Sequence, residues 1–223
     1  MVEIRPSRLI GLAATELRRR LYANDVFYGL DFDLTGIIAV PDVGVPLVVR
    51  EIQESDIPLL LPMRRQNMNS GELRIRLERL MLLQAGIPAC YVCVAPGEQP
   101  CGMCWLISSR SNRLLQRHFH GGIQELGAGE VLLENIYTRP DRRGGHIMGY
   151  LTLKLFEIAS QQGATRAIAF IKAENQASLQ GAQWIGWKLR FIKKVTWRLF
   201  FRRIAYSYDL SEHTVSVDDS HTP

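Results

Sequence analysis

The chain has 223 residues, of which 47% are hydrophobic, so it is long enough to bury a full core as a single domain. Its formal net charge of +5 suits an anionic ligand or surface but does not select one class of anion. Runs of about 18 or more apolar residues are absent, and the first residues lack the apolar core of a signal peptide. We therefore expect a cytoplasmic protein without a transmembrane segment.

The first part of the chain predicts a helix followed by a strand. Ser7 can cap a helix over residues 8–23. Residues 28–34 then alternate between apolar and polar side chains, which is typical of a half-buried strand. We interpret residues 1–45 as an N-terminal extension packed on the core. A lid or a homodimer contact is the alternative.

The next segment predicts a helix and a hairpin. The helix covers residues 72–84 and ends before Pro88. Its expected core face consists of four apolar side chains, namely Leu73, Leu77, Leu80 and Met81. Two apolar runs, residues 90–95 and 101–107, flank a Pro-rich turn and predict the hairpin.

Four cysteines lie in this predicted hairpin as two C-x-x-C pairs, and they suggest two interpretations. Zinc binding is one, but the pairs are closer together than in a zinc ribbon. Side chains at i and i+3 of an extended strand also point to opposite faces. We therefore predict small hydrophobic side chains in the core of the hairpin, and no metal site.

Three further segments have distinctive compositions. Residues 108–129 are polar and longer than an ordinary strand connection, so we expect them to shape a substrate entrance. His118 and His120 in this segment are interpreted as solvated, with a substrate contact by His118 as the alternative. The basic run 188–203 could bind nucleic acid or an anionic membrane. We favour a long strand entering the last hairpin, with apolar residues facing the core and cations facing water. A patch that selects an acidic substrate is the alternative. Residues 211–223 are polar and predicted to be disordered.

The most informative stretch is a predicted strand, a glycine loop and a helix start. The strand covers residues 131–137, a turn follows over 138–141, and a helix opens near His146. Between them lies an Arg-Arg-Gly-Gly loop, residues 142–145. Unpaired N–H groups at a helix N-terminus bind phosphate, glycines allow close backbone approach, and the arginines add cationic donors. An anion site is therefore predicted here, with a plain charged turn as the alternative.

A second stretch supports the anion site. A predicted strand over residues 166–171 leads into Asn175 and Ser178, followed by Gly186 and Trp187. Together the two stretches resemble the Gcn5-related N-acetyltransferase (GNAT) superfamily. Its pyrophosphate loop reads P-x-x-R-G-x-G-x-G, and the segment Pro140-Asp-Arg-Arg-Gly144 matches as far as the first glycine. Its second motif reads N-x-x-S-x-x-x-Y-x-x-x-G-F. Asn175, Ser178, Gly186 and Trp187 match this motif in spacing.

The resemblance covers residues 46–210 and implies an α/β (α+β) fold, with a mixed, mainly antiparallel sheet flanked by helices. Residues 46–58 resemble the family's first strand and helix start, and 133–138 the strand that pairs with the pantetheine arm of acetyl-CoA. The co-substrate implied is acetyl-CoA or another acyl-CoA. The residues expected to bind it are Ile136, Tyr137, Thr138, Arg142, Arg143, Gly144, Gly145, His146, Ile147, Met148, Gly149, Asn175 and Ser178.

Three positions depart from the family's pattern. His146 and Met148 stand where the family prefers small residues, so the loop is expected to be less close-fitting. His146 could also donate directly to a phosphate. Ala182 stands where many members carry a tyrosine that reprotonates the CoA thiolate.

Transfer of an acyl group to an amine requires a base that removes a proton from the amine. In this superfamily a glutamate on the strand before the loop often does so. Alternation predicts that Glu130, Leu132, Glu134 and Ile136 share one face of this strand. Glu134 lies nearer the predicted thioester, whereas Glu130 matches the spacing of the histone-modifying branch. We rank Glu134 above Glu130 as the catalytic base.

The predicted function is acyl transfer from acyl-CoA to a small-molecule or peptide amine, directly and within a ternary complex. One alternative is a degenerate domain that binds acyl-CoA or a partner without turnover, suggested by His146, Met148 and Ala182. Another is a long-chain N-acyltransferase, in which the aromatic C-terminal strands would line a lipid tunnel. Nucleic acid is not a predicted partner.

Overall fold

The computed structural model describes residues 6–36, 46–62, 70–95, 97, 99–144 and 146–209. Its strands are β1 (Tyr22–Asp33), β2 (Val48–Glu51), β3 (Cys90–Val94), β4 (Pro100–Ser108), β5 (Glu130–Thr138), β6 (Arg166–Lys172), β7 (Lys188–Arg198) and β8 (Phe201–Ser207). Its α-helices are α1 (Pro6–Leu21), α2 (Ile57–Leu60), α3 (Ser70–Gln84), α4 (Asn112–Phe119), α5 (Ile147–Gln161) and α6 (Gln176–Ile185). Short 3-10 turns are η1 (Glu54–Asp56), η2 (Ser109–Ser111) and η3 (Pro140–Arg142).

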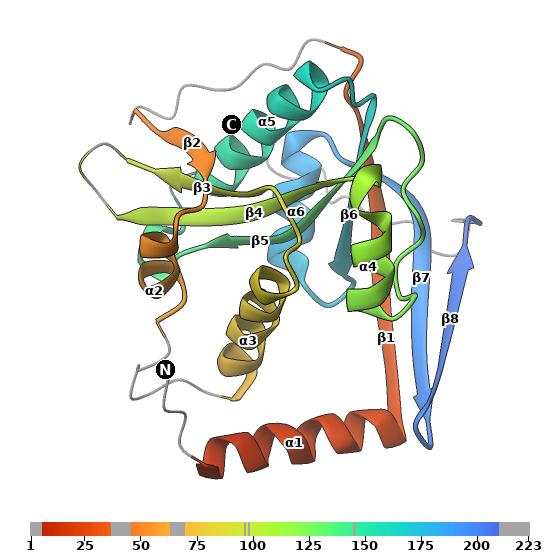
Figure 1. Cartoon of the computed structure of the whole chain (residues 1–223). Helices are drawn as coiled ribbons and strands as arrows, with labels where there is room; N and C mark the ends of the chain where they lie inside the picture. The colour runs from red at the N-terminus through yellow and green to blue at the C-terminus, as the bar shows by residue number, and fades with distance from the viewer. Residues whose placement is uncertain are drawn as a thin grey trace, which may run out of the picture.

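All the strands belong to one sheet with the order β2-β3-β4-β5-β6-β1-β7-β8. The neighbours pair antiparallel except β5 and β6, which are parallel (Figure 1). The mixed, mainly antiparallel sheet flanked by helices is therefore confirmed. In the part of the chain that is described, no helix is long and apolar enough to cross a membrane.

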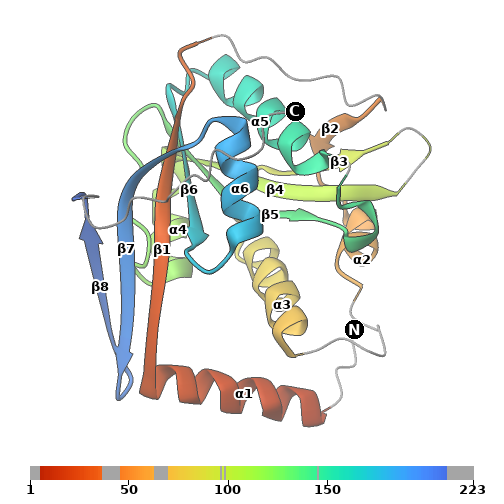
Figure 2. The ribbon, with the colours of Figure 1, turned by 180° about the vertical axis from the view of Figure 1, so that it is seen from behind.

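Helices cover both faces of the sheet and create two cores. On one face α5 packs through Leu155 and Phe156, both fully buried, with α6 beside it (Figure 2). On the other face α2, α3 and α4 contribute buried leucines, among them Leu82 and Leu115. We call the second face the α3 face, because α3 lies against the part of the sheet that matters for the site. The first is the α5 face.

The N-terminal strand is part of the sheet itself. We predicted an extension packed on the core, and β1 goes further because it pairs with β6 on one edge and β7 on the other. Helix α1 lies across the end of this strand (Figure 1). Its last carbonyls, on Arg20 and Leu21, accept hydrogen bonds of 2.8 and 3.0 Å from the N–H groups of Phe200 and Leu199 in the β7–β8 turn. The C-terminal end of α1 is thus bonded to the β7–β8 turn.

The segment after β4 contains a helix that the sequence analysis did not anticipate. Helix α4 is anchored by Asn112, whose side chain exchanges hydrogen bonds of 2.9 and 3.0 Å with the backbone of Leu126. The helix ends at His120, which adopts a left-handed conformation with φ of 50°. His118 therefore lies on a helix and not on a strand. Residues 211–223, predicted to be disordered, lie outside the described residues.

The predicted β3–β4 hairpin and the predicted β7–β8 hairpin are both confirmed. All four cysteines are buried, Cys90 on the α3 face and the other three on the α5 face. Across the described residues, no group of three or more metal-ligating side chains comes together.

Candidate functional site

Strands β5 and β6 pair over only part of their lengths. The parallel register runs from Glu130 and Arg166 to Leu133 and Ala169, and it stops there. Both strands continue, β5 as far as Thr138, but they diverge (Figure 2). The last five residues of β5 therefore have one edge paired with β4 and one edge open. An open strand edge can hydrogen-bond an extended ligand.

A β-bulge at Asn135 sets which side chains face the site. Asn135 has a positive φ of 55°. Met103 pairs with Tyr137, and Trp105 pairs with Glu134. One residue thus lies between the paired positions on β4, whereas two lie between them on β5. The extra residue places Glu134 and Tyr137 on the α3 face and turns Ile136 to the α5 face. The prediction that Glu134 and Ile136 share one face is therefore wrong.

The open edge presents unused hydrogen-bond donors. The N–H of Arg139 donates to the carbonyl of Cys101 in β4 at 2.8 Å. Because successive N–H groups of a strand point to opposite edges, those of Thr138 and Ile136 point to the open edge. The hydroxyl oxygen of Thr138 is buried and has no partner among the described residues. These features fit a ligand that lies along the edge.

The predicted anion loop connects this edge to α5. Turn η3 ends at Arg142, Gly144 has a φ of 85°, and His146 precedes the first turn of α5 with a φ of 54°. No side chain of the described residues caps the helix, so its first N–H groups, on Ile147, Met148 and Gly149, are available to an anion. Arg142, Arg143 and His146 are exposed beside them. Gly145 lies outside the described residues.

The two departures in the loop are accommodated by α6. A Cβ atom on Gly181 would lie 2.3 Å from the Met148 methyl carbon, so the methionine occupies the space that this glycine leaves. Trp184 packs in the same way on Gly149, because a Cβ atom added to that glycine would lie 3.0 Å from the indole ring. The His146 ring lies 5.5 Å from the Trp184 ring. Met148 thus serves helix packing, while His146 stays exposed at the loop. Gly181 and Trp184 were not singled out by the sequence analysis.

Asn175 and Ser178 act together at the start of α6. The Asn175 side-chain oxygen accepts a hydrogen bond of 3.3 Å from the Ser178 N–H, which caps the helix. This hydrogen bond gives both residues a structural role as the cap of α6. Their contact with CoA stays a prediction. Ala182 is buried against the core.

Glu134 lies at the point where β5 and β6 begin to diverge. Its carboxylate accepts a hydrogen bond of 3.2 Å from the side chain of Asn135. Burial raises its pKa from the usual 4.5 to about 7, against the opposing attraction of Lys193 and Arg79. A carboxylate with a pKa near neutrality is suited to accept a proton at physiological pH.

Glu130 occupies the other end of the strand and has a different environment. One carboxylate oxygen accepts from Arg166 at 3.1 Å and the other from the N–H of Gly127 at 2.8 Å. Arg166 also lies 3.8 Å from Asp31 in β1. These contacts join strand ends, so Glu130 has a structural explanation.

Two cations near Glu134 were missed by the sequence analysis. The predicted core face of the helix 72–84 is partly wrong, because Met81 is 57% exposed whereas Arg79 is 7% exposed. The alternation in β7 assigned its cations to water, yet Lys193 is also 7% exposed. Burial lowers the pKa of Arg79 to about 10 and that of Lys193 to about 8. The negative charge of Glu134 opposes both shifts.

Comparisons with known proteins bear on the fold. No family model and no curated protein matches this sequence. Solved structures do match. A GCN5-related N-acetyltransferase from Sphaerobacter thermophilus is 13% identical with a TM-score of 0.50. A GCN5-related glucosamine N-acetyltransferase region of a fungal multi-domain GH3 β-N-acetylglucosaminidase is 14% identical with a TM-score of 0.59.

The chain has the GNAT fold. The matches cover 90% of this chain in the bacterial comparison and 87% in the fungal one. The same matches cover 58% of the bacterial chain and 23% of the fungal chain. At these identities the likeness establishes the GNAT fold, and the site residues described above come from the geometry of this chain.

Proposed function

We propose that this chain transfers an acyl group, most simply acetyl, from acyl-CoA to a primary amine. The observation that carries the proposal is one arrangement: a half-buried glutamate with a raised pKa, an open strand edge and an uncapped helix N-terminus follow one another along 134–149. A base, an acyl-binding edge and an anion site are the three parts that this reaction needs. The GNAT fold supports the same assignment.

The binding part of the proposal uses the loop and the strand edge. The pyrophosphate would lie at the N-terminus of α5, where N–H groups and the exposed Arg142 and Arg143 meet it. The pantetheine arm would pair with β5, and the N–H groups of Ile136 and Thr138 could polarise the thioester carbonyl. The buried hydroxyl of Thr138, which has no partner among the described residues, fits a ligand at this edge.

The chemical part of the proposal uses Glu134. In its ionised form it accepts a proton from the acceptor ammonium, directly or through water, and the neutral amine attacks the thioester carbonyl. The C–S bond then breaks, and the CoA thiolate takes up the proton that the new amide nitrogen loses, directly or through water. Direct transfer is favoured over a covalent enzyme intermediate because all four cysteine thiols are buried. Burial raises the pKa of Cys90 to about 12, and the one thiol whose pKa is lowered, Cys101, is 3% exposed and donates to the carbonyl of Cys93. Glu130 is the second candidate base, but its ion pair with Arg166 already engages it.

Gly144 offers a test with a matched control. Gly144 and Gly163 lie at opposite ends of α5 with φ values of 85° and 87°. Apart from its two chain neighbours, a Cβ atom added to either would meet no atom of the described residues within 4 Å. Gly144→Val and Gly163→Val therefore introduce the same backbone strain. Only the first obstructs backbone approach to a phosphate. We expect Gly144→Val to weaken CoA binding by tenfold or more, on the order of 1.4 kcal/mol, measured by calorimetry. Equal CoA affinity in the two variants would contradict the phosphate loop.

The second candidate is a domain that binds acyl-CoA without turnover. The observation in its favour is that Ala182, which replaces the usual tyrosine, is buried and offers no acidic group. A thiol-release assay over a broad amine panel, run beside CoA calorimetry, separates the two. Amine-dependent release of CoA supports the transferase. Tight CoA binding without release on any amine supports the binding domain.

A further inference from the structure

Two arginines of α3 are buried on the same side of the helix, but only one of them is paired. Arg76 is 3% exposed and donates hydrogen bonds to the carbonyl of Pro62 and to Glu72. Arg79, one turn later, makes no hydrogen bond or ion pair within the described residues, and its Nε has no partner. Its guanidinium lies over the Tyr137 ring, 4.4 Å from the centroid. Arg76 thus has a structural explanation, whereas the Nε donor of Arg79 has no partner among the described residues.

Lys193 is the second buried cation of this region. It comes from β7, and its ammonium lies 4.8 Å from the Phe170 ring centroid and 5.3 Å from that of Phe27. No carboxylate of the described part of the chain forms an ion pair with it. Aromatic rings stabilise a cation only in part, by about 0.5–2 kcal/mol. Withdrawal of an ammonium from water costs several kcal/mol.

Both cations lie on the same face of the sheet as the proposed base, Arg79 over Tyr137 and Lys193 over Phe170. Glu134 lies on the α3 face, and its charge acts on Arg79 and on Lys193. Glu78 also acts on Arg79, but it is exposed and lies 3.6 Å from Arg74. Among the described residues Glu134 is therefore the carboxylate that acts on both cations, and one carboxylate cannot neutralise two cations. Trp105, paired with Glu134 across the β4–β5 ladder, adds an indole N–H that is also buried and unpartnered among the described residues. The region is rich in donors and short of acceptors.

Four residues beside the cations are only partly buried, namely Glu134, Tyr137, Phe170 and Phe27. Glu134 lies where β5 and β6 diverge. A ligand bound there would meet the cations on the α3 face and the strand edge beside them. Oxygen-rich anions are the groups that guanidinium and ammonium donors bind best in a desolvated site.

We infer that the acceptor amine carries an acidic group, a carboxylate or a phosphate, and that Arg79 and Lys193 bind this group. The inference rests on the proposed function. An anion held by the two cations would place the rest of a small acceptor beside Glu134, so that its amine is near the base and the thioester. Such an acceptor also supplies the negative charge that the described residues lack.

The test uses pairs of amines that differ only in the acidic group. Suitable pairs are β-alanine with propylamine, 4-aminobutyrate with butylamine, and 2-aminoethyl phosphate with ethanolamine. Two readouts are taken on the full chain: CoA release from acetyl-CoA, and calorimetric binding of each amine to the CoA complex. We expect at least one acidic member to exceed its neutral partner by tenfold or more in kcat/KM and in affinity.

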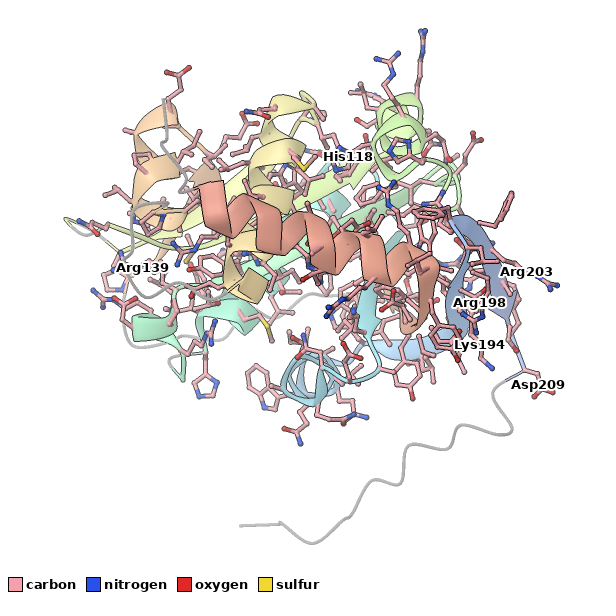
Figure 3. The ribbon with its side chains drawn as sticks, turned by 90° about the horizontal axis from the view of Figure 1, so that it is seen from below. His118, Arg139, Lys194, Arg198, Arg203 and Asp209 are labelled. Carbon is pink, nitrogen blue, oxygen red and sulfur yellow. The ribbon has the colours of Figure 1, made fainter. Side chains whose placement is uncertain are left out.

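The variants are Arg79→Met, Arg79→Lys and Lys193→Met, with Lys194→Met as the matched control. Lys194 is the next residue of β7 but is exposed on the opposite face, near Arg198 and Arg203 (Figure 3). Arg79→Met and Lys193→Met should each remove most of the preference for the acidic member, and Arg79→Lys should keep part of it. The control should retain it. CoA affinity checks that each variant is folded.

The outcomes separate the inference from the proposed function. No CoA release with any amine would count against the transferase, while the binding readout would still report on the anion site. Equal affinity for acidic and neutral members, or a preference that survives in both Met variants, would overturn the inference. In that case the two cations are satisfied by buried water alone.

Discussion

Glu130 and Glu134 are four residues apart on one strand, and their surroundings differ in almost every respect. Glu130 lies where β5 and β6 are paired, and it is bonded by Arg166 and by a backbone N–H. Glu134 lies where the strands part, and its side chain accepts a hydrogen bond from the neighbouring Asn135. In our proposal the same carboxyl group joins strands in one place and acts as a base in the other. The position relative to the strand divergence, rather than the residue type, would then decide the role.

The largest expected effect is on catalysis. Glu134→Gln keeps the size of the side chain but removes the proton acceptor, so kcat should fall by roughly 100-fold or more near neutral pH with CoA affinity unchanged. Glu130→Gln should change kcat by less than about threefold, because it loses only a surface ion pair. Steady-state kinetics on both variants checks the ranking. A larger loss in Glu130→Gln would move the base to the paired end of the strand.

The second expected effect is on the pH profile. Glu134 must be ionised to accept a proton, and its pKa is about 7. With an acceptor amine that stays neutral over the whole range, kcat/KM should rise about tenfold per pH unit below pH 7 and level off above it. Lys193 holds this pKa down, so Lys193→Met should move the midpoint to higher pH. A flat profile in the wild-type chain would remove Glu134 from the mechanism.

The smallest expected effect is on stability, and its sign differs between the two glutamates. The pKa of Glu134 is higher in the folded chain than its usual 4.5, so the free energy of unfolding falls as pH rises from 4.5 to about 7. Relative to the unsubstituted chain, Glu134→Gln should therefore gain stability between pH 5 and pH 8, by about 1–3 kcal/mol.

Glu130→Gln should lower stability by about 0.5 kcal/mol, because its ion pair is partly exposed. Urea unfolding at pH 5 and pH 8 checks both values. Equal changes in the free energy of unfolding of the two variants would mean that burial does not disfavour the ionised form of Glu134.

The local parts of the site could be predicted from the sequence. The strand, loop and helix that include Arg143 and Gly144 are contiguous, and each has its own periodicity or glycine signal. The hairpin of β7 and β8 was predicted for the same reason. The order of the strands could not be predicted, because the alternation in β1 identifies a half-buried strand but does not name β6 and β7 as its neighbours.

The side chains that surround Glu134 were harder to predict. The bulge at Asn135 depends on the register with β4, which the sequence of β5 alone does not contain. Lys193 is buried because Phe27 and Phe170, from distant parts of the chain, come to lie beneath it. Arg79 was not among the residues of the predicted core face of its helix, because charged residues usually lie on the solvent side. Both cations break the ordinary pattern, and such breaks are typical of functional sites.

The insertion of β1 between β6 and β7 has a consequence for how the chain must fold. The strand that leaves the ribosome early has neighbours that are made more than a hundred residues later, from Arg166 and from Lys188 onward. Until then β1 has two unsatisfied edges, and loop closure over that length is slow. Assembly of the β2–β5 half can precede it, because those strands pair with near neighbours. The sheet therefore cannot be complete until β6 and β7 have been made, long after β1.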